Sequence, residues 1–317
     1  MDILVTIPIS NSEDNSFITP EIEQTLESMG KVIWNTFTRQ FSSEELKEKL
    51  KDIDVCITGW SCPHLDHDVL ENAEKLRLVA HTGGTVAPIV SDYLYDRGIK
   101  VISGNKLYAE SVAEGVVAYI LSSLRDIPYY AHFMKSGGWK GDNYYIEGLL
   151  DQSIGLVGFG MVAKYLVKMV APFRSKVKVY DPYAKEDVLR EHGVEKASLE
   201  DIFSNCKIIS IHAPKIPDTY HMIDKRLIEM IPEDSILINT ARGSIIDEEA
   251  LTEELQKNRF KAVLDVYEVE PLPDESILRK LSNVILIPHM AGPTIDRRKY
   301  VTMAIIDDIN NFLTVGN

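Results

Sequence analysis

The segment from residue 153 to 181 constrains the fold of this chain more than any other. Its apolar run IGLV is typical of a buried strand, and the letters GFGMVA follow as a helical pattern begins. Gly158 permits a tight turn, Gly160 lets the backbone approach a phosphate, and the small Ala163 lets the helix pack on its strand. A second apolar strand ends in Asp181, whose carboxylate can accept bonds from both hydroxyls of a ribose. We therefore predict a dinucleotide-binding βαβ unit, and Asp181 favours NAD because the 2'-phosphate of NADP would meet its negative charge.

The composition is that of an ordinary globular protein with a strong negative charge. The 317 residues leave room for two domains, and 45% of them are hydrophobic. The net charge of −14 disfavours sequence-independent binding to nucleic acid or to an anionic membrane. The first residues lack a basic leader, and no apolar run approaches the roughly 18 residues of a membrane span, so we expect a cytoplasmic protein. Cys56, Cys62 and Cys206 are odd in number and widely spread, which favours reduced thiols.

Residues 1–102 alternate between strand and helix patterns, which predicts a parallel sheet covered on both faces. No glycine fingerprint follows the first strand, where IPISNSEDNS predicts a polar loop. We therefore expect a substrate-side domain that does not bind nucleotide. The expected strands are Ile3–Ile9, Lys31–Trp34, Val55–Gly59, Leu76–His81 and Ile99–Ile102. The expected helical or turn-helix segments are 20–29, 43–51, 67–75 and 86–97, the second capped by Ser42 or Ser43.

A long helix is expected over Tyr108–Arg125, with Ser111 to Glu114 as a capping box at its start. The next segment, Asp126–Leu150, shows no periodicity and is expected to be a surface connection. The alternation then resumes from Ser153, with further strands expected at Lys207–His212, Ser235–Thr240, Lys261–Val266 and Val284–Pro288 and a helix at Asp247–Lys257.

The C-terminal stretch Thr294–Leu313 reads as an amphipathic helix that crosses back onto the first domain. The sequence thus predicts an α/β fold of two doubly wound parallel-sheet domains. A Rossmann NAD-binding domain at 103–290 would be inserted in a flavodoxin-like substrate-binding domain formed by 1–102 and 291–317.

Functional side chains gather where the expected strands of the second domain end. Hydride transfer to or from an alcohol carbon needs a group that exchanges the hydroxyl proton, and an imidazole suits that task. A carboxylate bonded to the imidazole fixes its tautomer, and a guanidinium can hold a substrate carboxylate at two points. Arg242, Glu270 and His289 supply this set on successive strand ends.

These residues and their spacing resemble a known family, the D-isomer-specific 2-hydroxyacid dehydrogenases of the phosphoglycerate dehydrogenase and glycerate/hydroxypyruvate reductase type. The motifs that carry the resemblance are SVAE from Ser111, GFGMVA with Asp181-Pro182-Tyr183, His212-Ala213-Pro214, NTARGSIIDEEAL from Asn239, LDVYEVEPLP from Leu264 and PHMAGPT from Pro288.

The resemblance implies an NAD-dependent dehydrogenase acting on a small D-2-hydroxy acid or its 2-oxo partner. Arg242 would bind the substrate, His289 would act as acid/base and Glu270 would pair with His289. The Gly83 and Gly84 amides would bind the substrate carboxylate. A homodimer would form through the helix near Ser111. The residues expected at the cofactor are Gly158, Gly160, Met161, Val162, Asp181, His212, Ala213, Pro214, Thr240, Ala241, Asp265 and Gly292.

Other interpretations remain open at this stage. The segment Cys62–Asp68 has residue types of a metal site, but solvated loop histidines and an Asp66 helix cap explain it better, so no metal is expected. His81 is expected to be structural rather than to touch substrate. An NAD-sensing corepressor-like protein on the same fold is the alternative function. Formate dehydrogenase is a third reading, which the carboxylate of Glu270 opposes because formate oxidation needs no proton acceptor.

Overall fold

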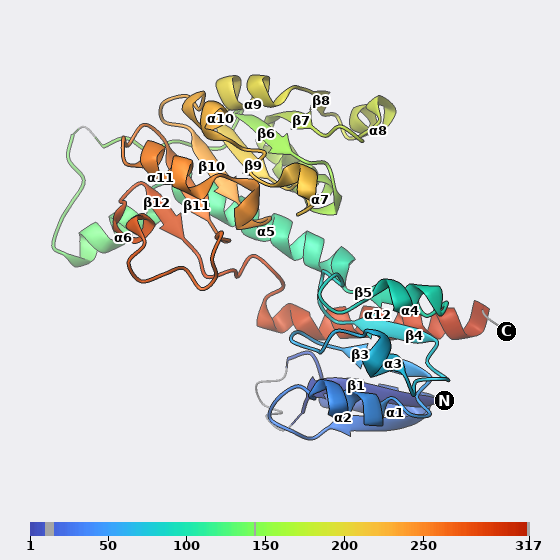
Figure 1. Cartoon of the computed structure of the whole chain (residues 1–317). Helices are drawn as coiled ribbons and strands as arrows, with labels where there is room; N and C mark the ends of the chain where they lie inside the picture. The colour runs from blue at the N-terminus through green and yellow to red at the C-terminus, as the bar shows by residue number, and fades with distance from the viewer. Residues whose placement is uncertain (10–15, 143, 316–317) are drawn as a thin grey trace. The chain divides into compact units, whose positions relative to one another are not determined.

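The computed structural model describes residues 1–9, 16–142 and 144–315, and the predicted polar loop after the first strand falls largely outside them (Figure 1). The chain divides into two compact units, Met1–Ala109 with Pro293–Asn317 and Glu110–Gly292. Each unit has its own sheet, and all strand pairs in both sheets are parallel. The predicted fold class, two doubly wound parallel sheets, is confirmed.

The first unit contains a five-stranded sheet with the order β2-β1-β3-β4-β5, which is the flavodoxin-like order. Its central strands β1, β3 and β4 are buried along almost all of their length, as parallel strands are when helices cover both faces. The elements are β1 (Asp2–Pro8), α1 (Pro20–Met29), β2 (Lys31–Asn35), α2 (Ser43–Lys49), β3 (Val55–Thr58), α3 (His67–Leu70), β4 (Leu78–His81), α4 (Asp92–Asp96), β5 (Lys100–Ser103) and α12 (Ile295–Val315).

Helices cover both faces of this sheet. The apolar side chains of α1 and α12 pack on one face, and those of α2, α3 and α4 pack on the other. Val301, Ile305 and Ile309 form the buried stripe of α12. The prediction that the C-terminal helix returns to the first domain is therefore confirmed. The predicted Ser42 cap is also confirmed, since Ser42 and Glu45 form a reciprocal capping box at the start of α2.

The second unit contains a seven-stranded sheet with the order β12-β11-β10-β9-β6-β7-β8, the doubly wound order of a dinucleotide-binding domain. The long helix α5 (Asn105–Leu124) begins in the first unit and continues into the second. The other elements are α6 (Ile127–Lys135), β6 (Ser153–Val157), α7 (Met161–Val170), η1 (Ala171–Phe173), β7 (Lys176–Tyr180), α8 (Glu186–Glu191), β8 (Glu195–Lys196), α9 (Leu199–Asn205), β9 (Ile208–Ile211), η2 (Pro217–Thr219), α10 (Lys225–Glu229), β10 (Ile236–Asn239), η3 (Gly243–Ile245), α11 (Glu248–Leu255), β11 (Lys261–Leu264), η4 (Ile277–Lys280) and β12 (Val284–Leu286).

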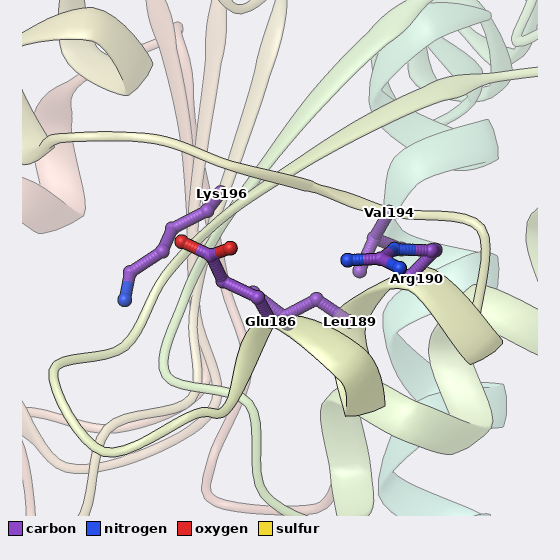
Figure 2. A pocket seen from close by; sticks show the side chains of 5 residues that line it. All are labelled: Glu186, Leu189, Arg190, Val194 and Lys196. Carbon is purple, nitrogen blue, oxygen red and sulfur yellow. The ribbon is translucent and has the colours of Figure 1, made fainter.

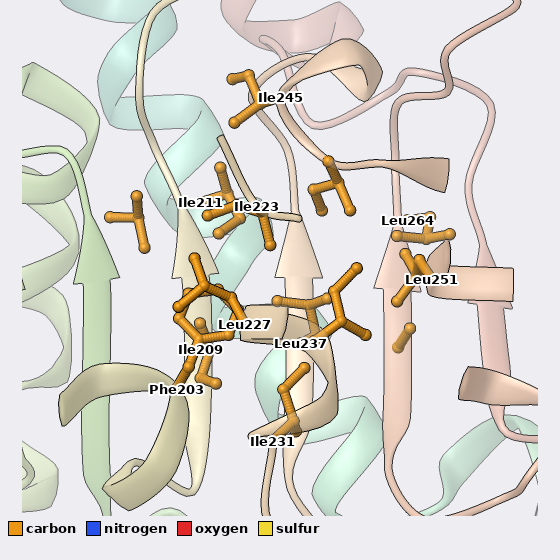
Figure 3. Close-up of a cluster of buried hydrophobic side chains, with 14 of the residues drawn as sticks. Phe203, Ile209, Ile211, Ile223, Leu227, Ile231, Leu237, Ile245, Leu251 and Leu264 are labelled. Carbon is orange, nitrogen blue, oxygen red and sulfur yellow. The ribbon is translucent and has the colours of Figure 1, made fainter. Parts of the chain in front are cut away.

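The second unit also has a core on each face of its sheet. Figure 3 shows one of them, where Phe203 of α9, Leu227 of α10 and Leu251 of α11 meet the side chains of β9, β10 and β11. The opposite face is covered by α5 and α7, with Val116 and Leu166 fully buried. Because helices pack on both faces of the sheet, the carboxyl ends of its strands are held in fixed positions.

The local structure differs from what was expected in four places. Ser111 does not cap α5, because the helix already begins at Asn105, and Leu107 and Tyr108 pack into the core of the first unit. The segment 126–150 contains the helix α6, which starts with a proline in its first turn and buries no side chain. The helix expected over 67–75 ends at Leu70, and the short strand β8 was not expected.

Candidate functional site

The register of the second sheet brings the predicted residues to one edge. Val157, Ile211, Asn239, Leu264 and Leu286 are aligned across five neighbouring strands. The next residues along these strands are Gly158, His212, Thr240, Asp265 and Ile287, and backbone bonds continue the ladder there, with His212 N–H donating to Val157 O at 2.7 Å and Asp265 N–H to Asn239 O at 3.0 Å. The carboxyl ends of parallel strands are where doubly wound domains bind ligands.

The glycine turn leaves room where a phosphate would bind. Gly158 has a φ of +97°, and a Cβ there would lie 2.8 Å from the Ala213 nitrogen, so only glycine fits. Gly160 has an ordinary φ of −75°, and no atom lies within 4 Å of the position that its Cβ would take. Gly160 precedes the first residue of α7, whose N-terminal N–H groups and dipole favour anions. Met161, Val162 and Ala213 adjoin this turn, and Ala213 is buried.

Asp181 lies directly beside the glycine turn. Its Oδ2 accepts the N–H of Phe159 at 2.8 Å, and its Oδ1 accepts the N–H groups of Tyr183 and Ala184 at 2.8 and 3.0 Å. These bonds orient the carboxylate at the end of β7. Oδ1 already accepts two N–H groups, so Oδ2 is the oxygen that keeps a lone pair for a ribose hydroxyl. The residues present therefore fit the adenosine half of NAD.

Arg242 ends a turn that follows β10. The Asn239 side chain braces this turn by accepting the N–H of Ala241 at 3.1 Å and donating to Arg242 O at 3.0 Å. The buried Thr240 hydroxyl has no hydrogen-bond partner among the described residues, as expected of a group that faces a ligand. The Arg242 guanidinium donates to Ala241 O at 2.6 Å and is half-buried.

The structure brings His289 and Glu270 together. His289 Nδ1 and Glu270 Oε2 are 2.8 Å apart, and the other Glu270 oxygen accepts the Tyr267 N–H at 3.1 Å. Burial alone would raise the pKa of Glu270, but the bonds from His289 and Tyr267, with the positive charge of Arg242, outweigh it and lower this pKa. The carboxylate is thus ionised near neutral pH and accepts the Nδ1–H of His289.

Asp265 supports the turn that carries His289. Its two oxygens accept the N–H groups of Met290 and Ala291 at 2.7 and 3.1 Å, and its backbone oxygen accepts the N–H of His289 at 2.9 Å. Burial raises the pKa of Asp265. His289 itself has a φ of +51°, a left-handed conformation that these bonds hold in place. Gly292, also expected at the cofactor, ends this turn.

Three residues of the site were missed by the sequence analysis. The Tyr119 hydroxyl lies 3.5 Å from Asp265 Oδ1, although the two residues are far apart in the sequence. Tyr267 donates from its hydroxyl to Leu264 O and Ile287 O at 2.9 and 3.0 Å, linking β11 to the end of β12. A Cβ on Gly243 would overlap the Tyr267–Glu268 peptide, so this glycine lets the Arg242 turn pack on the Glu270 segment.

The predicted substrate glycines lie in the first unit, after β4. A Cβ on Gly83 would touch the His81 ring, and one on Gly84 would lie 3.2 Å from the Tyr108 ring. His81 is buried, and its Nδ1 lies 3.0 Å from the Thr58 hydroxyl. Burial lowers the pKa of His81 to about 4, so the ring is neutral at pH 7. Burial likewise lowers the pKa of His212 in the second unit to about 4.

Described residues of the second unit line cavities of different character. One of about 600 Å³ has Glu270, Arg279 and His289 in its wall. The other, of about 290 Å³, has Glu186 and Lys196 on one side and Arg190 on the other and includes none of the predicted site residues (Figure 2).

The described residues contain neither a cluster of metal ligands nor a helix that could span a membrane. No group of three or more His, Cys, Asp or Glu side chains is arranged to hold a metal ion there. Asp66 caps α3 by accepting the Val69 N–H, as predicted. Within 1–9, 16–142 and 144–315, none of the helices combines the length and apolar character that crossing a membrane requires.

Known proteins resemble this chain along almost its whole length. It is 32% identical to a D-3-phosphoglycerate dehydrogenase of Methanocaldococcus jannaschii over 98% of the chain and 57% of that protein. It is 31% identical to a hydroxypyruvate reductase of Thermotoga maritima over 90% of the chain and 94% of that protein. The fold matches the crystal structure of the TT0316 protein from Thermus thermophilus with a TM-score of 0.81, 23% identity and coverage of 99% of this chain and 97% of that one.

Residues 117–291 match the family model described as the NAD binding domain of D-isomer specific 2-hydroxyacid dehydrogenases. This segment contains the glycine turn, Asp181 and the Arg242, Glu270 and His289 set. The predicted family is thereby confirmed: the chain belongs to the D-isomer specific 2-hydroxyacid dehydrogenases, NAD(P)-dependent oxidoreductases of 2-hydroxy and 2-oxo acids.

Proposed function

We propose that this chain uses NAD to interconvert a small D-2-hydroxy acid and the matching 2-oxo acid. The observation that carries the proposal is the Glu270–His289 pair, 2.8 Å apart at the strand ends of a dinucleotide-binding sheet. The nicotinamide, when bound, supplies or accepts the hydride at C2 of the substrate. The protein must then hold the substrate and move one proton.

His289 is the proposed acid/base. Its Nδ1 is engaged by Glu270, so Nε2 is the ring atom left to exchange a proton with the substrate oxygen. In the direction of reduction, protonated His289 gives this proton to the carbonyl oxygen, and ionised Glu270 stabilises the charged ring before the transfer. In the reverse direction Nε2 takes the hydroxyl proton.

Arg242, Gly83 and Gly84 are the proposed substrate-binding groups. A guanidinium matches the planar geometry of a carboxylate and polarises a neighbouring carbonyl. Backbone N–H groups of two consecutive glycines can hold carboxylate oxygens without side-chain obstruction. The reading of NAD rather than NADP rests on Asp181 and its orientation by Phe159.

The direct test measures NADH oxidation by the loss of its near-ultraviolet absorbance. The substrates are glyoxylate, pyruvate, hydroxypyruvate, phenylpyruvate and longer branched 2-oxo acids, and each assay is repeated with NADPH. Turnover with a preferred acid and with NADH over NADPH supports the proposal. Tight NADH binding without turnover of any acid in the panel would favour an NAD-sensing corepressor-like protein instead.

A homodimer, expected through the helix that contains Ser111, and a cytoplasmic location are also part of the proposal, and the exposed side chains of α6 could extend the dimer contact. The helix α6 buries none of its side chains, and Tyr129, Met134 and Trp139 are exposed on it and just after it, as expected of a surface that a second copy covers. Sedimentation equilibrium would measure the dimer, and cell fractionation would test the location.

A further inference from the structure

The sheet of the first unit has a topological switch point that the proposed function leaves without a ligand. Its order is β2-β1-β3-β4-β5, so the connection after β1 leads to one side and the connection after β3 leads to the other. Ligands of doubly wound domains bind in the crevice between two such connections, at the carboxyl ends of the strands. In this unit the switch point lies between the segments that follow β1 and β3.

One arginine lies between these two segments. Phe17 comes from the connection after β1 and Trp60 from the connection after β3, and their rings pack edge to face at 5.1 Å. The guanidinium of Arg298, in the first turn of α12, lies 5.4 Å from the Phe17 ring and 5.3 Å from the Trp60 ring. Two cation–π contacts fix a charge in this position.

Arg298 has no carboxylate partner among the described residues. Its Nε is buried without a hydrogen-bond acceptor, and Nη1 has only a long contact of 3.4 Å to the Ser16 hydroxyl. Buried nitrogen donors almost always have a hydrogen-bond acceptor, and a guanidinium prefers an anionic one. The donors on this guanidinium therefore point to an anionic ligand.

Tyr108 adds a second hydrogen-bond donor and connects the arginine to the substrate glycines. Its hydroxyl is buried without a partner among the described residues, and the charge of Arg298 acts on it. Its ring packs against Trp60 at 6.3 Å. The same ring contacts the Gly84 position, so successive contacts join Gly84, Tyr108, Trp60 and Arg298 within the first unit.

We propose that Arg298 and Tyr108 bind a second anionic group of the substrate, a carboxylate or a phosphate, while Gly83 and Gly84 take the carboxylate next to C2. The inference rests on the proposed function and narrows its substrate class to 2-oxo acids that are acidic at both ends. Trp60 and Phe17 hold the guanidinium in its binding orientation. The start of α12 adds a favourable helix dipole.

The test compares the wild type with Arg298→Gln on two substrate groups, each with NADH. The first group, pyruvate and 2-oxobutyrate, carries one anionic group. In the second group, oxaloacetate and 2-oxoglutarate carry a second carboxylate, and 3-phosphohydroxypyruvate carries a phosphate. The wild type should prefer one of the acids with two anionic groups. Arg298→Gln should lower kcat/KM for that acid by about 10- to 100-fold, mainly through KM, with little change for pyruvate. The preferred acid tells a carboxylate site from a phosphate site.

Lys299→Gln is the matched control, because Lys299 is a cation of the same helical turn that lies over Tyr300 instead. It should leave the preference intact. An equal loss on all acids in Arg298→Gln, or no preference for two anionic groups in the wild type, would overturn the proposal.

A direct binding measurement separates this inference from the proposed function. If no acid is turned over, calorimetric titration with inorganic phosphate and with malonate still tests the site. Binding to the wild type that is lost in Arg298→Gln would support the anion site without the enzyme. Equal binding to both proteins, or none to either, would overturn it.

Discussion

Asp265 and Glu270 use their carboxylates in different ways, and both uses serve His289. Glu270 bonds to the ring and sets its tautomer, whereas Asp265 bonds to the backbone that follows and holds a left-handed turn. The first arrangement follows from the residue types, since a carboxylate beside a histidine is a common pair. The second depends on where a backbone N–H points, which the sequence does not reveal. Asp265 was expected at the nicotinamide, and that contact stays a prediction.

Gly160 allows a test of cofactor binding that leaves the fold intact. Because its φ is ordinary and its Cβ position is open, Gly160→Ala should change the thermal midpoint little. The added methyl group should raise the Kd for NADH about 10-fold or more by obstructing the pyrophosphate. Fluorescence titration with NADH measures the Kd. Gly193→Ala, at another glycine with open space but a φ of +68°, should lose some stability and keep NADH affinity. Unchanged NADH affinity in Gly160→Ala would mean that the phosphates bind elsewhere.

At the scale of the elements, the strands were predictable and the irregular helices were not. Buried parallel strands are continuous apolar runs, so the pattern alone located the strands of both sheets except the short, exposed edge strand β8. The start of α5 was missed because the local capping signal at Ser111 was weaker than the packing of Leu107 and Tyr108. The helix α6 has no buried face, so no hydrophobic period marks it. The strand ends meet at one edge, which is why Arg242, Glu270 and His289 could be grouped from sequence, whereas the Tyr119–Asp265 contact could not.

His221 joins the segments that carry Arg242 and Glu270. Its N–H donates to Ser244 O at 2.9 Å, and its ring lies 2.5 Å from a Glu268 oxygen. His221→Ala keeps the backbone bond to Ser244 and loses the ring bond to Glu268, so the two segments are no longer joined and kcat/KM should fall about 10-fold. His221→Gln should restore part of the activity by donating to Glu268. Steady-state kinetics with the preferred acid measure the effect.

Lys225→Gln is the control for His221, since Lys225 also bridges two segments of this unit, through Glu253 at 2.8 Å, away from the site. It should leave the kinetics unchanged. A lower thermal midpoint for His221→Ala with normal kinetics would limit this histidine to a structural role.

At the scale of the whole molecule, buried neutral histidines make stability depend on pH. The pKa of His81 is lowered from 6.5 to about 4 in the folded chain. As the pH falls, the His81 ring is therefore protonated near pH 6.5 in the unfolded chain but only near pH 4 in the folded chain. The contribution of His81 to the free energy of unfolding is therefore greatest above pH 6.5. It decreases as the pH drops toward 4, by about 3 kcal/mol in total. His212 acts in the same direction.

Urea denaturation at several pH values checks this expectation. His81→Gln should flatten the dependence between pH 6.5 and 4, and His132→Gln, at an exposed histidine, should leave it unchanged. The same slope in His81→Gln as in the wild type would show that His81 is not the group responsible.

The most direct test of the proposed chemistry is to measure kcat and the NADH Kd together in His289→Ala. The predicted result is a loss of turnover by a factor of about 10² to 10⁴, with NADH bound nearly as tightly as by the wild type, because the imidazole moves the substrate proton. Turnover near the wild-type level would contradict the account, and an equal loss of turnover and NADH binding would show that His289 acts on the cofactor site instead.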